Sequence, residues 1–202
     1  APIDVVIGWD KGVPVSVDGK TYTGAQLVDV LGELCERYGI GRNIHVGETV
    51  LGIKGRVGFE AGAALTLIAA HRELEKLVQT KWQGFWKDHL ARFYGDRLHE
   101  GQYFDPALRD IEALLQSSQQ RVTGETRLRL SPGRFQVTGA RSPASLLDRA
   151  VATYGEENLL WSGEEARGFA RVSAVAPLLA ARALARAESI AASTQTEGED
   201  RR

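Results

Sequence analysis

The chain has 202 residues, of which 43% are hydrophobic and 25% charged, and its formal net charge is -1. This much apolar surface excludes disorder throughout, and the near-zero charge argues against a dedicated nucleic-acid binder, which needs a basic face. The single cysteine, Cys35, excludes a disulfide framework and a multi-cysteine metal site. It is typical of a reducing compartment, so we expect a cytoplasmic protein.

The N-terminus has no basic region followed by an apolar core, so we expect no signal peptide. The longest apolar stretch, Gly62 to Ala70, is shorter than the roughly 20 residues a bilayer requires. We therefore expect no membrane-spanning segment and no membrane partner. The sequence also contains no methionine, which favours an excised or processed part of a longer protein.

The predicted elements of the first half are strands over 3–9 and 13–17, a helix over 23–38, and a strand-like stretch over 43–54. Gln26 follows Thr23 at the spacing of a capping box, which marks the start of the helix. Apolar residues then recur on one helical face, and Gly39 ends the pattern.

The predicted elements of the second half begin with helices over 60–79 and 82–99, a helix from Asp105-Pro106 and a hairpin over 122–140. A further helix is predicted from Ser142-Pro143, with one face formed by Leu147, Ala150, Val151 and Tyr154. A final helix is predicted over 172–190. Residues 126–130 alternate, which indicates a half-exposed antiparallel hairpin. The mixture predicts an α+β fold with a mostly antiparallel sheet, several packed helices and an extended C-terminal helix. The polar residues 191–202 predict a disordered tail.

General catalytic signatures are missing from the sequence. No GxxxxGK[ST] loop is present, and Gly39-Ile40-Gly41 does not open a helix as a dinucleotide loop would. The histidines have no metal-ligand spacing, and we interpret them as structural or surface residues: His45, His71, His89 and His99. We therefore predict no catalytic residue, no bound cofactor and no metal site on this chain alone.

Two segments carry more information. In the glycine-rich run over 52–60, Lys54 and Arg56 would point the same way if the backbone is extended. The run is either a ligand-binding loop, because glycines let a backbone approach a ligand closely, or a solvated strand end. The C-terminal helix packs either on its own core or on another subunit, and composition does not choose between the two.

Six segments in order resemble the C-terminal half of argininosuccinate synthase over residues 1–190. The longest is VLGIKGRVGFEAGAALTLIAAHRELE at 50–75, where the family carries a Gly-apolar-Lys-Ser-Arg-Gly-apolar-Tyr-Glu run and then a helix ending in Ala-His. The others are KGVPVSV at 11–17, YGIGR at 38–42, SQQRVTG at 118–124, GARSPASL at 139–146 and RGF at 167–169.

The resemblance implies a synthetase and multimerisation domain over residues 1–190. The family's N-terminal domain binds ATP with Mg through a Ser-Gly-Gly-x-Asp loop, which this sequence does not contain. The resemblance further implies that citrulline is adenylated on its ureido oxygen and that aspartate then displaces AMP. The chain would contribute part of the citrulline pocket, would form a homotetramer through its C-terminal helix, and would be inactive without the nucleotide-binding domain.

The sequence departs from the family pattern at the expected pocket. Gly47 stands at the position of a citrulline-contacting glutamate, with Glu48 adjacent, and Phe59 stands at that of a citrulline-contacting tyrosine. The expected substrate-binding residues are therefore Glu48, Phe59, Gly47, Lys54 and Arg56. Glu48 replaces the missing glutamate only if the strand slips by one residue, and such a slip also exchanges the two faces of a strand.

Three functions are compatible with these features. The first is the synthetase domain of an argininosuccinate synthase, the second a related ATP-dependent ligase that joins a different ureido or amide acceptor to an amine, and the third an assembly subunit without catalysis. In the first two, the stretch around Lys54 must present an open face to a nucleotide-binding module, whereas enclosure in a self-sufficient core would exclude them.

Overall fold

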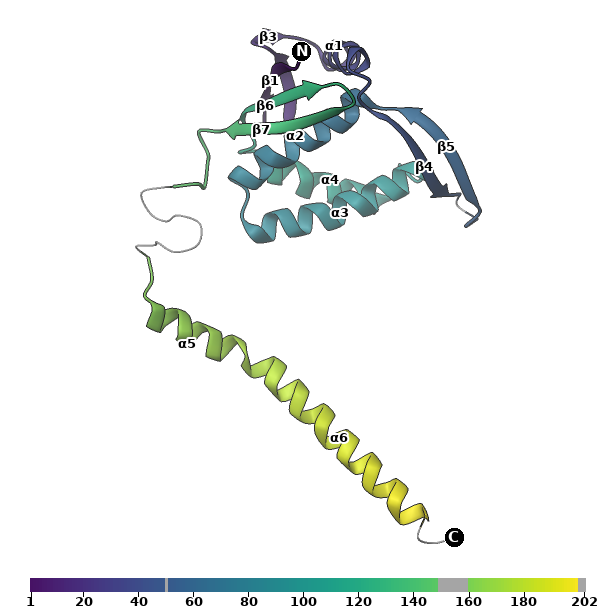
Figure 1. Cartoon of the computed structure of the whole chain (residues 1–202), viewed down its shortest axis with the longest axis vertical. Helices are drawn as coiled ribbons and strands as arrows, with labels where there is room; N and C mark the ends of the chain where they lie inside the picture. The colour runs from purple at the N-terminus through teal and green to yellow at the C-terminus, as the bar shows by residue number, and fades with distance from the viewer. Residues whose placement is uncertain (50, 149–159, 200–202) are drawn as a thin grey trace. The chain divides into compact units, whose positions relative to one another are not determined.

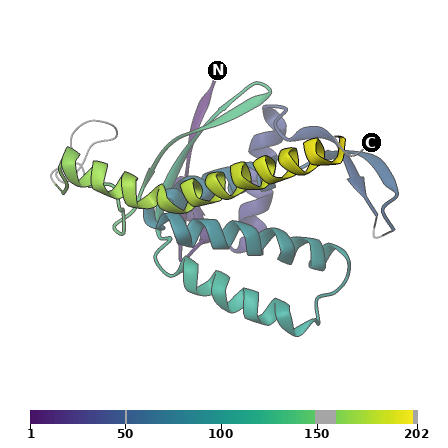
Figure 2. The ribbon, with the colours of Figure 1, turned by 90° about the horizontal axis from the view of Figure 1, so that it is seen from below.

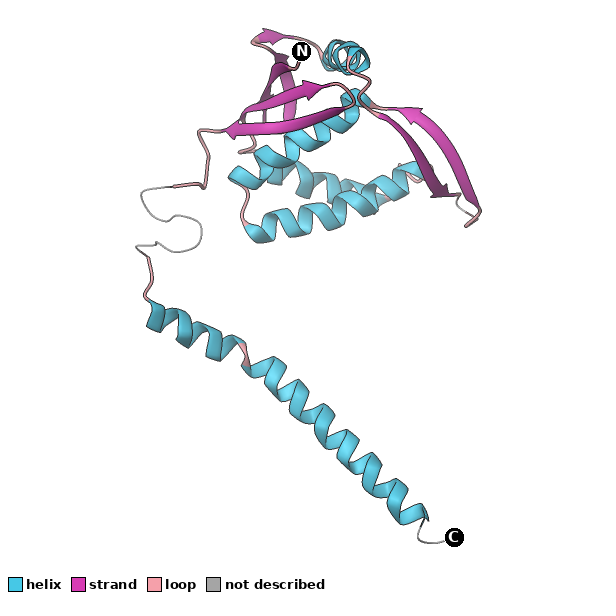
Figure 3. Cartoon of the chain, in the orientation of Figure 1, coloured by secondary structure: helices cyan, strands magenta, loops and turns pink. Residues whose placement is uncertain are grey.

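The computed structural model describes residues 1–49, 51–148 and 160–199 (Figure 1). These residues form two compact units, Ala1–Leu147 and Asp148–Arg202, where the sequence predicts one domain over 1–190. Helices and antiparallel strands are both present in the first unit (Figure 3). The predicted α+β class is confirmed.

A five-stranded antiparallel sheet organises the first unit, with the strand order β3-β2-β1-β6-β7. Its strands are β1 (Ile3–Asp10), β2 (Val13–Val17), β3 (Lys20–Thr21), β6 (Gly124–Ser131) and β7 (Arg134–Arg141). In β6, Leu128 and Leu130 are buried and Arg127 and Arg129 are exposed, as the alternation predicts. One face of the sheet is therefore the core face.

Helices α1 (Gly24–Arg37) and α2 (Gly62–Val78) pack on this sheet and on each other. The predicted capping box at the start of α1 is present, with Thr23 and Gln26 bonded reciprocally. The apolar stripe of α1 buries Leu27, Leu31 and Cys35. Burial of this stripe against the sheet supplies the main driving force for the fold.

Helices α3 (Lys81–His99) and α4 (Pro106–Gln119) lie side by side (Figure 2). Asp105 accepts a hydrogen bond from the backbone N–H of Ala107, which confirms the predicted start of α4. Helix α3 has no buried residue, and the aromatic side chains of Trp82, Phe85 and Trp86 are exposed.

The strands β4 (Arg42–Glu48) and β5 (Lys54–Glu60) form a separate antiparallel hairpin that extends away from the sheet (Figure 1). The prediction of one strand-like stretch over 43–54 was wrong, because the chain reverses between Glu48 and Lys54. Gly52 adopts a φ of +76°, which favours glycine, and its N–H donates to the carbonyl of Thr49 at 2.8 Å. Residues 54–60 of the glycine-rich run are thus a strand, and residues 52 and 53 belong to the turn before it.

The helix predicted from Ser142-Pro143 is absent from residues 142–148, which are irregular. Ser142 donates its hydroxyl proton to the carbonyl of Thr123 at 2.6 Å and accepts from the N–H of Ala144 at 3.1 Å. These bonds hold a turn rather than a helix start. Leu147 lies in this irregular segment, and the other predicted helix residues, Ala150, Val151 and Tyr154, lie outside the described residues.

The second unit contains α5 (Gly163–Ser173) and α6 (Val175–Glu199). Helix begins before the predicted residue 172 because Ser162 and Glu165 form a capping box. Helix α6 also continues through 191–199, where the sequence predicts a disordered tail. Five of these nine residues are alanine, glutamine or glutamate, which have high helix propensity.

Within the described residues, one stretch, 163–190, is long and apolar enough to cross a membrane by length and composition. The sequence predicted no membrane-spanning segment because its longest uninterrupted apolar run is short, whereas residues 163–190 meet the criterion through the mean hydropathy of a helix. Helices that pack on protein meet the same criterion. Arg182 and Arg186 follow Val175 by seven and eleven residues and so share its face. A charge at a bilayer centre costs about 2.5–3.5 kcal/mol, which favours protein contact.

Candidate functional site

The β4–β5 hairpin holds all five expected substrate-binding residues, and its register divides them between two faces. The pairs Gly47–Gly55, His45–Val57 and Asn43–Phe59 share one face, and the pairs Glu48–Lys54, Val46–Arg56, Ile44–Gly58 and Arg42–Glu60 share the other. We call the first the His45 face and the second the Lys54 face. Gly47 and Phe59 therefore lie on the His45 face, and Glu48, Lys54 and Arg56 lie opposite.

The Lys54 face is strongly charged, and most of its charges are paired. Lys54 forms an ion pair with Glu48, and the Nε of Arg42 lies 2.9 Å from Oε1 of Glu60. Among the described residues, no carboxylate pairs with Arg56, whose neighbour across the hairpin is Val46. Arg56 can therefore bind an anionic group without first breaking an ion pair.

The register is continuous along the hairpin, from Arg42 opposite Glu60 to Glu48 opposite Lys54. The one-residue slip that would let Glu48 take the place of a residue at 47 is not present. Glu48 instead points away from the His45 face, because successive side chains of a strand alternate.

Both faces of the hairpin are open. The apolar side chains of Ile44, Val46 and Val57 are 56%, 63% and 55% exposed, and Lys54 and Arg56 are exposed as well. A hollow of about 570 Å³ lies along the base of the hairpin, lined by Arg42, Asn43, Ile44, Gly58, Phe59 and Glu60. A lone two-stranded hairpin is marginally stable in water, so this arrangement favours a partner that covers it.

His45 contributes to this site in a way that the sequence did not indicate. A Cβ atom placed on Gly47 would lie 2.7 Å from Nε2 and 3.1 Å from Cδ2 of His45. The exposed imidazole thus lies over the backbone of Gly47, and it would have to turn away to admit a side chain there. The signal in the sequence is a large residue two positions before a glycine, and it becomes informative only when residues 42–48 are known to form a strand.

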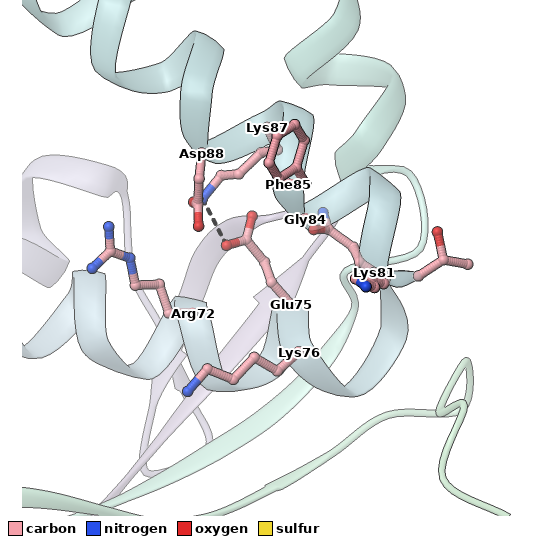
Figure 4. A pocket seen from close by; sticks show the side chains of 10 residues that line it. Arg72, Glu75, Lys76, Lys81, Gly84, Phe85, Lys87 and Asp88 are labelled. Carbon is pink, nitrogen blue, oxygen red and sulfur yellow. Dashed lines mark hydrogen bonds and ion pairs between the residues drawn. The ribbon is translucent and has the colours of Figure 1, made fainter. Parts of the chain in front are cut away.

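A second hollow, of about 680 Å³, lies between α2 and α3 (Figure 4). Glu75, a carboxylate of its lining, is already bound on both oxygens: Lys87 donates to Oε2 at 2.8 Å, and Gln119 donates to Oε1 at 2.7 Å. Nε2 of His71 lies 2.9 Å from Oε1 of Gln119. The ring of His71 packs on that of Trp9, with the centroids 5.1 Å apart. The network joins four elements, so we interpret it as structural.

Burial sets the ionisation of two groups in this unit. It lowers the pKa of His71, against the attraction of Glu75 and the hydrogen bond that the imidazole donates to Gln119, while the charge of Lys87 lowers the pKa further. Burial also raises the pKa of Cys35, although its contact with Thr66 opposes the change. Cys35 is therefore an inert thiol at neutral pH. Across residues 1–49, 51–148 and 160–199, no three His, Cys, Asp or Glu side chains are grouped as metal ligands.

Comparison with known proteins agrees with the resemblance seen in the sequence. Residues 1–179 match the family described as "Arginosuccinate synthase C-terminal domain". The chain is 42% identical over 170 residues to argininosuccinate synthase of Xanthomonas campestris pv. campestris, a match that covers 84% of this chain and 42% of the relative. The argininosuccinate synthase of Xylella fastidiosa is 41% identical over 171 residues, 85% of this chain and 42% of the relative.

A more distant match is argininosuccinate synthase of Staphylococcus aureus, 36% identical over 155 residues, 77% of this chain and 39% of the relative. The chain spans about two fifths of the length of these curated relatives. The fold, the ordered segments and the matches lead to one conclusion: the chain belongs to the argininosuccinate synthase C-terminal domain family.

Proposed function

We propose that the chain is the synthetase and self-association part of an argininosuccinate synthase-like ligase. In this reaction the ureido oxygen of the acceptor attacks the α-phosphate of ATP and displaces pyrophosphate. The amino nitrogen of aspartate then attacks the ureido carbon, AMP leaves, and the nitrogen loses its proton. The chain would hold the acceptor and would need a separate ATP-binding region, because it contains no Ser-Gly-Gly-x-Asp loop.

The observation that carries this proposal is the open β4–β5 hairpin. It holds the glycine-rich run of the longest resembling segment, yet both of its faces are exposed to solvent. A ligand held only by such a hairpin would have little buried area, whereas binding sites for small molecules bury most of their ligand. An ATP-binding module placed over the hairpin would close the site and orient the acceptor.

Self-association is the second part of the proposal. Large apolar side chains of α5 and α6 are at least half exposed, among them Phe169, Val172, Leu179 and Leu184. Contiguous apolar patches on a protein surface mark interaction sites. We propose that these helices pack on other copies of the chain in a homotetramer.

The catalytic part is tested by assaying two samples: the protein as its own gene encodes it, and residues 1–202 alone. Each receives ATP, Mg²⁺, aspartate and a ureido acceptor, and pyrophosphate and AMP are measured. We expect equal amounts of both products from the gene's own product and none from residues 1–202. ATP-independent turnover, or no turnover by the gene's own product with any ureido acceptor, would contradict the proposal.

A further inference from the structure

Helix α3 carries a row of aromatic side chains that the described residues leave open. Four of them recur at the spacing i, i+4, i+7 and i+11 and so lie on one face of the helix: Trp82, Trp86, His89 and Phe93. Phe85 lies between the two tryptophans, with its ring centroid 5.7 Å from that of Trp82 and 5.4 Å from that of Trp86. We call these five residues the aromatic row. Trp82, Trp86 and Phe93 are 63%, 56% and 47% exposed, and a contiguous apolar surface of this kind marks an interaction site.

The other side of α3 attaches the helix to the first unit. Lys87 donates to Glu75 on α2 at 2.8 Å (Figure 4), and the hydroxyl of Tyr94 donates to Glu112 on α4 at 2.7 Å. Neither Lys87 nor Tyr94 falls at the spacing of the aromatic row. The row is therefore not needed to hold α3 in place, and its rings are open to a partner.

Helix α6 has a face with the same spacing as the aromatic row. Its residues recur at i, i+4, i+7 and i+11, and we call them the arginine stripe: Val175, Leu179, Arg182 and Arg186. Val175 and Leu179 are 51% and 57% exposed, and both arginines are exposed as well. Because residues 82–93 and residues 175–186 each extend for about 16 Å along their helix axis, the row and the stripe can meet over their whole length.

The charge of the second unit restricts what can cover the arginine stripe. From residue 166 to residue 187 the sequence has no aspartate or glutamate, but it contains Arg167, Arg171, Arg182 and Arg186. A purely aliphatic partner would desolvate the guanidinium groups of the stripe without compensation. An aromatic partner accommodates them, because a guanidinium stacks on the face of a ring and tryptophan attracts a cation most strongly. An aromatic surface with carboxylates nearby is therefore the kind of partner that fits.

The aromatic row has this chemistry. Two of its rings already have a cation nearby: Nζ of Lys81 lies 5.2 Å from the ring centroid of Trp82, and the guanidinium carbon of Arg97 lies 5.6 Å from that of Phe93. Trp86, near the middle of the row, has no such neighbour among the described residues. The same helix also exposes two carboxylates, those of Asp88 and Asp96.

We propose that the aromatic row on α3 of one copy binds the arginine stripe on α6 of a second copy, with a guanidinium group of the stripe over Trp86. The inference rests on the self-association proposed above and adds the surface that receives α6. Two copies that exchange their α6 helices form two identical contacts, which is the closed arrangement of a twofold dimer. A stripe that packed on the row of its own chain would use the same groups without association, and the experiments below separate these two cases.

The first measurement is light scattering of residues 1–202 over a range of micromolar concentrations. Trp86→Ala should raise the dissociation constant about tenfold or more, since a tryptophan at the centre of an interface is a typical hot spot. Trp86→Phe keeps a ring and should retain most of the association. Phe104→Ala is the matched control, because Phe104 is 92% exposed and lies outside the row. Equal losses for Trp86→Ala and Phe104→Ala, or no loss for either, would overturn the inference.

Variants of the arginine stripe test the other side of the contact. Arg182→Gln combined with Arg186→Gln should weaken association to a similar degree, whereas Arg167→Gln, on α5, should not. Urea unfolding should give the wild-type midpoint for these variants and for Trp86→Ala, because the row and the stripe lie outside the buried core. Association that survives the double arginine substitution would contradict the inference.

A mixing experiment separates a contact between copies from a contact within one chain. Trp86→Ala keeps an intact stripe, and Leu179→Glu keeps an intact row. Each variant alone should be mainly monomeric in analytical ultracentrifugation, and an equimolar mixture should form heterodimers through one intact row and one intact stripe. A mixture that stays monomeric is the result expected for a stripe packed on its own chain, and it would rule out exchange between copies.

The outcomes separate the inference from the proposed function. Wild-type residues 1–202 that remain monomeric would contradict the proposed self-association, and the inference falls with it. Association of the wild type that Trp86→Ala leaves unchanged contradicts the inference alone. Neither measurement depends on turnover, so the catalytic part of the proposed function is tested separately.

Discussion

Glu75 on α2 and Lys87 on α3 form an ion pair of 2.8 Å whose side chains are only 6% and 14% exposed. Glu75 also accepts a hydrogen bond from Gln119 at the end of α4. One carboxylate thus connects three helices, and burial makes this connection sensitive to the loss of either charge.

Glu75→Gln should lower the free energy of unfolding toward the lower end of about 3–5 kcal/mol, because the largely buried Lys87 would keep only the exposed carboxylate of Asp88, 3.5 Å away. Urea unfolding followed by tryptophan fluorescence measures the change. Glu73→Gln is the matched control on the same helix, since Glu73 pairs with the exposed Lys76 at 2.6 Å. It should cost less than about 1 kcal/mol, and equal shifts for both variants would contradict the structural role of Glu75.

Protonation of His71 should destabilise the fold in mildly acidic solution. Burial lowers the pKa of His71 in the folded state, so the unfolded chain binds more protons as the pH falls through the ordinary value of about 6.5. Stability that is present above that pH is therefore lost progressively toward the lower, folded pKa. Unfolding free energies measured from pH 7.5 to 5 should show this slope.

His71→Gln should make the same slope shallower, because the variant has no group to protonate there. His99→Gln is the control, because His99 is exposed, and it should leave the slope as in the wild type. A slope that survives unchanged in His71→Gln would assign the acid sensitivity to other groups.

Gly62 at the start of α2 should not tolerate a side chain. A Cβ atom there would overlap the Cβ of Cys35 on α1 and lie 2.8 Å from the carbonyl oxygen of Ile40. Gly62→Ala should destabilise the protein by about 1–3 kcal/mol through overpacking. Gly95→Ala, in α3 with no atom within 4 Å of its Cβ position, should stabilise it by about 0.5–1 kcal/mol. We expect the two variants to change the free energy of unfolding in opposite directions, as measured by urea denaturation.

Removal of residues 149–202 should leave a folded monomer. All buried apolar residues of the described core lie between Val5 and Leu130, so the first unit keeps its core. Light scattering should show association for residues 1–202 and none for 1–148. Leu179→Glu should weaken association, whereas Ala180→Glu, on another face of α6, should not; equal effects would contradict packing through the face of Leu179.

The local signals of the sequence predicted most elements of the fold. Thr23 with Gln26 and Asp105 with Pro106 mark helix starts, and alternation in β6 shows which side chains enter the core. These features depend on residues within one turn or one strand, so the sequence predicts them without knowledge of the tertiary structure. The helix predicted from Ser142-Pro143 was wrong because a long-range contact decides the local structure. The hydroxyl of Ser142 donates to the carbonyl of Thr123, nineteen residues away, and this bond holds a turn.

The hairpin shows what only the tertiary structure decided. Glycines and exposed apolar residues hide its alternation, so the sequence showed neither two strands nor their register. The sequence did identify the segment, its charges and the departures at Gly47 and Phe59. The pairing of β4 with β5 then placed Val57 opposite His45, Gly55 opposite Gly47 and Lys54 opposite Glu48. The physical reason is that the side chains of one strand alternate by themselves, whereas the neighbours across the hairpin depend on which strand pairs with it and in which register. Pairing is a property of two segments, so neither segment shows it alone.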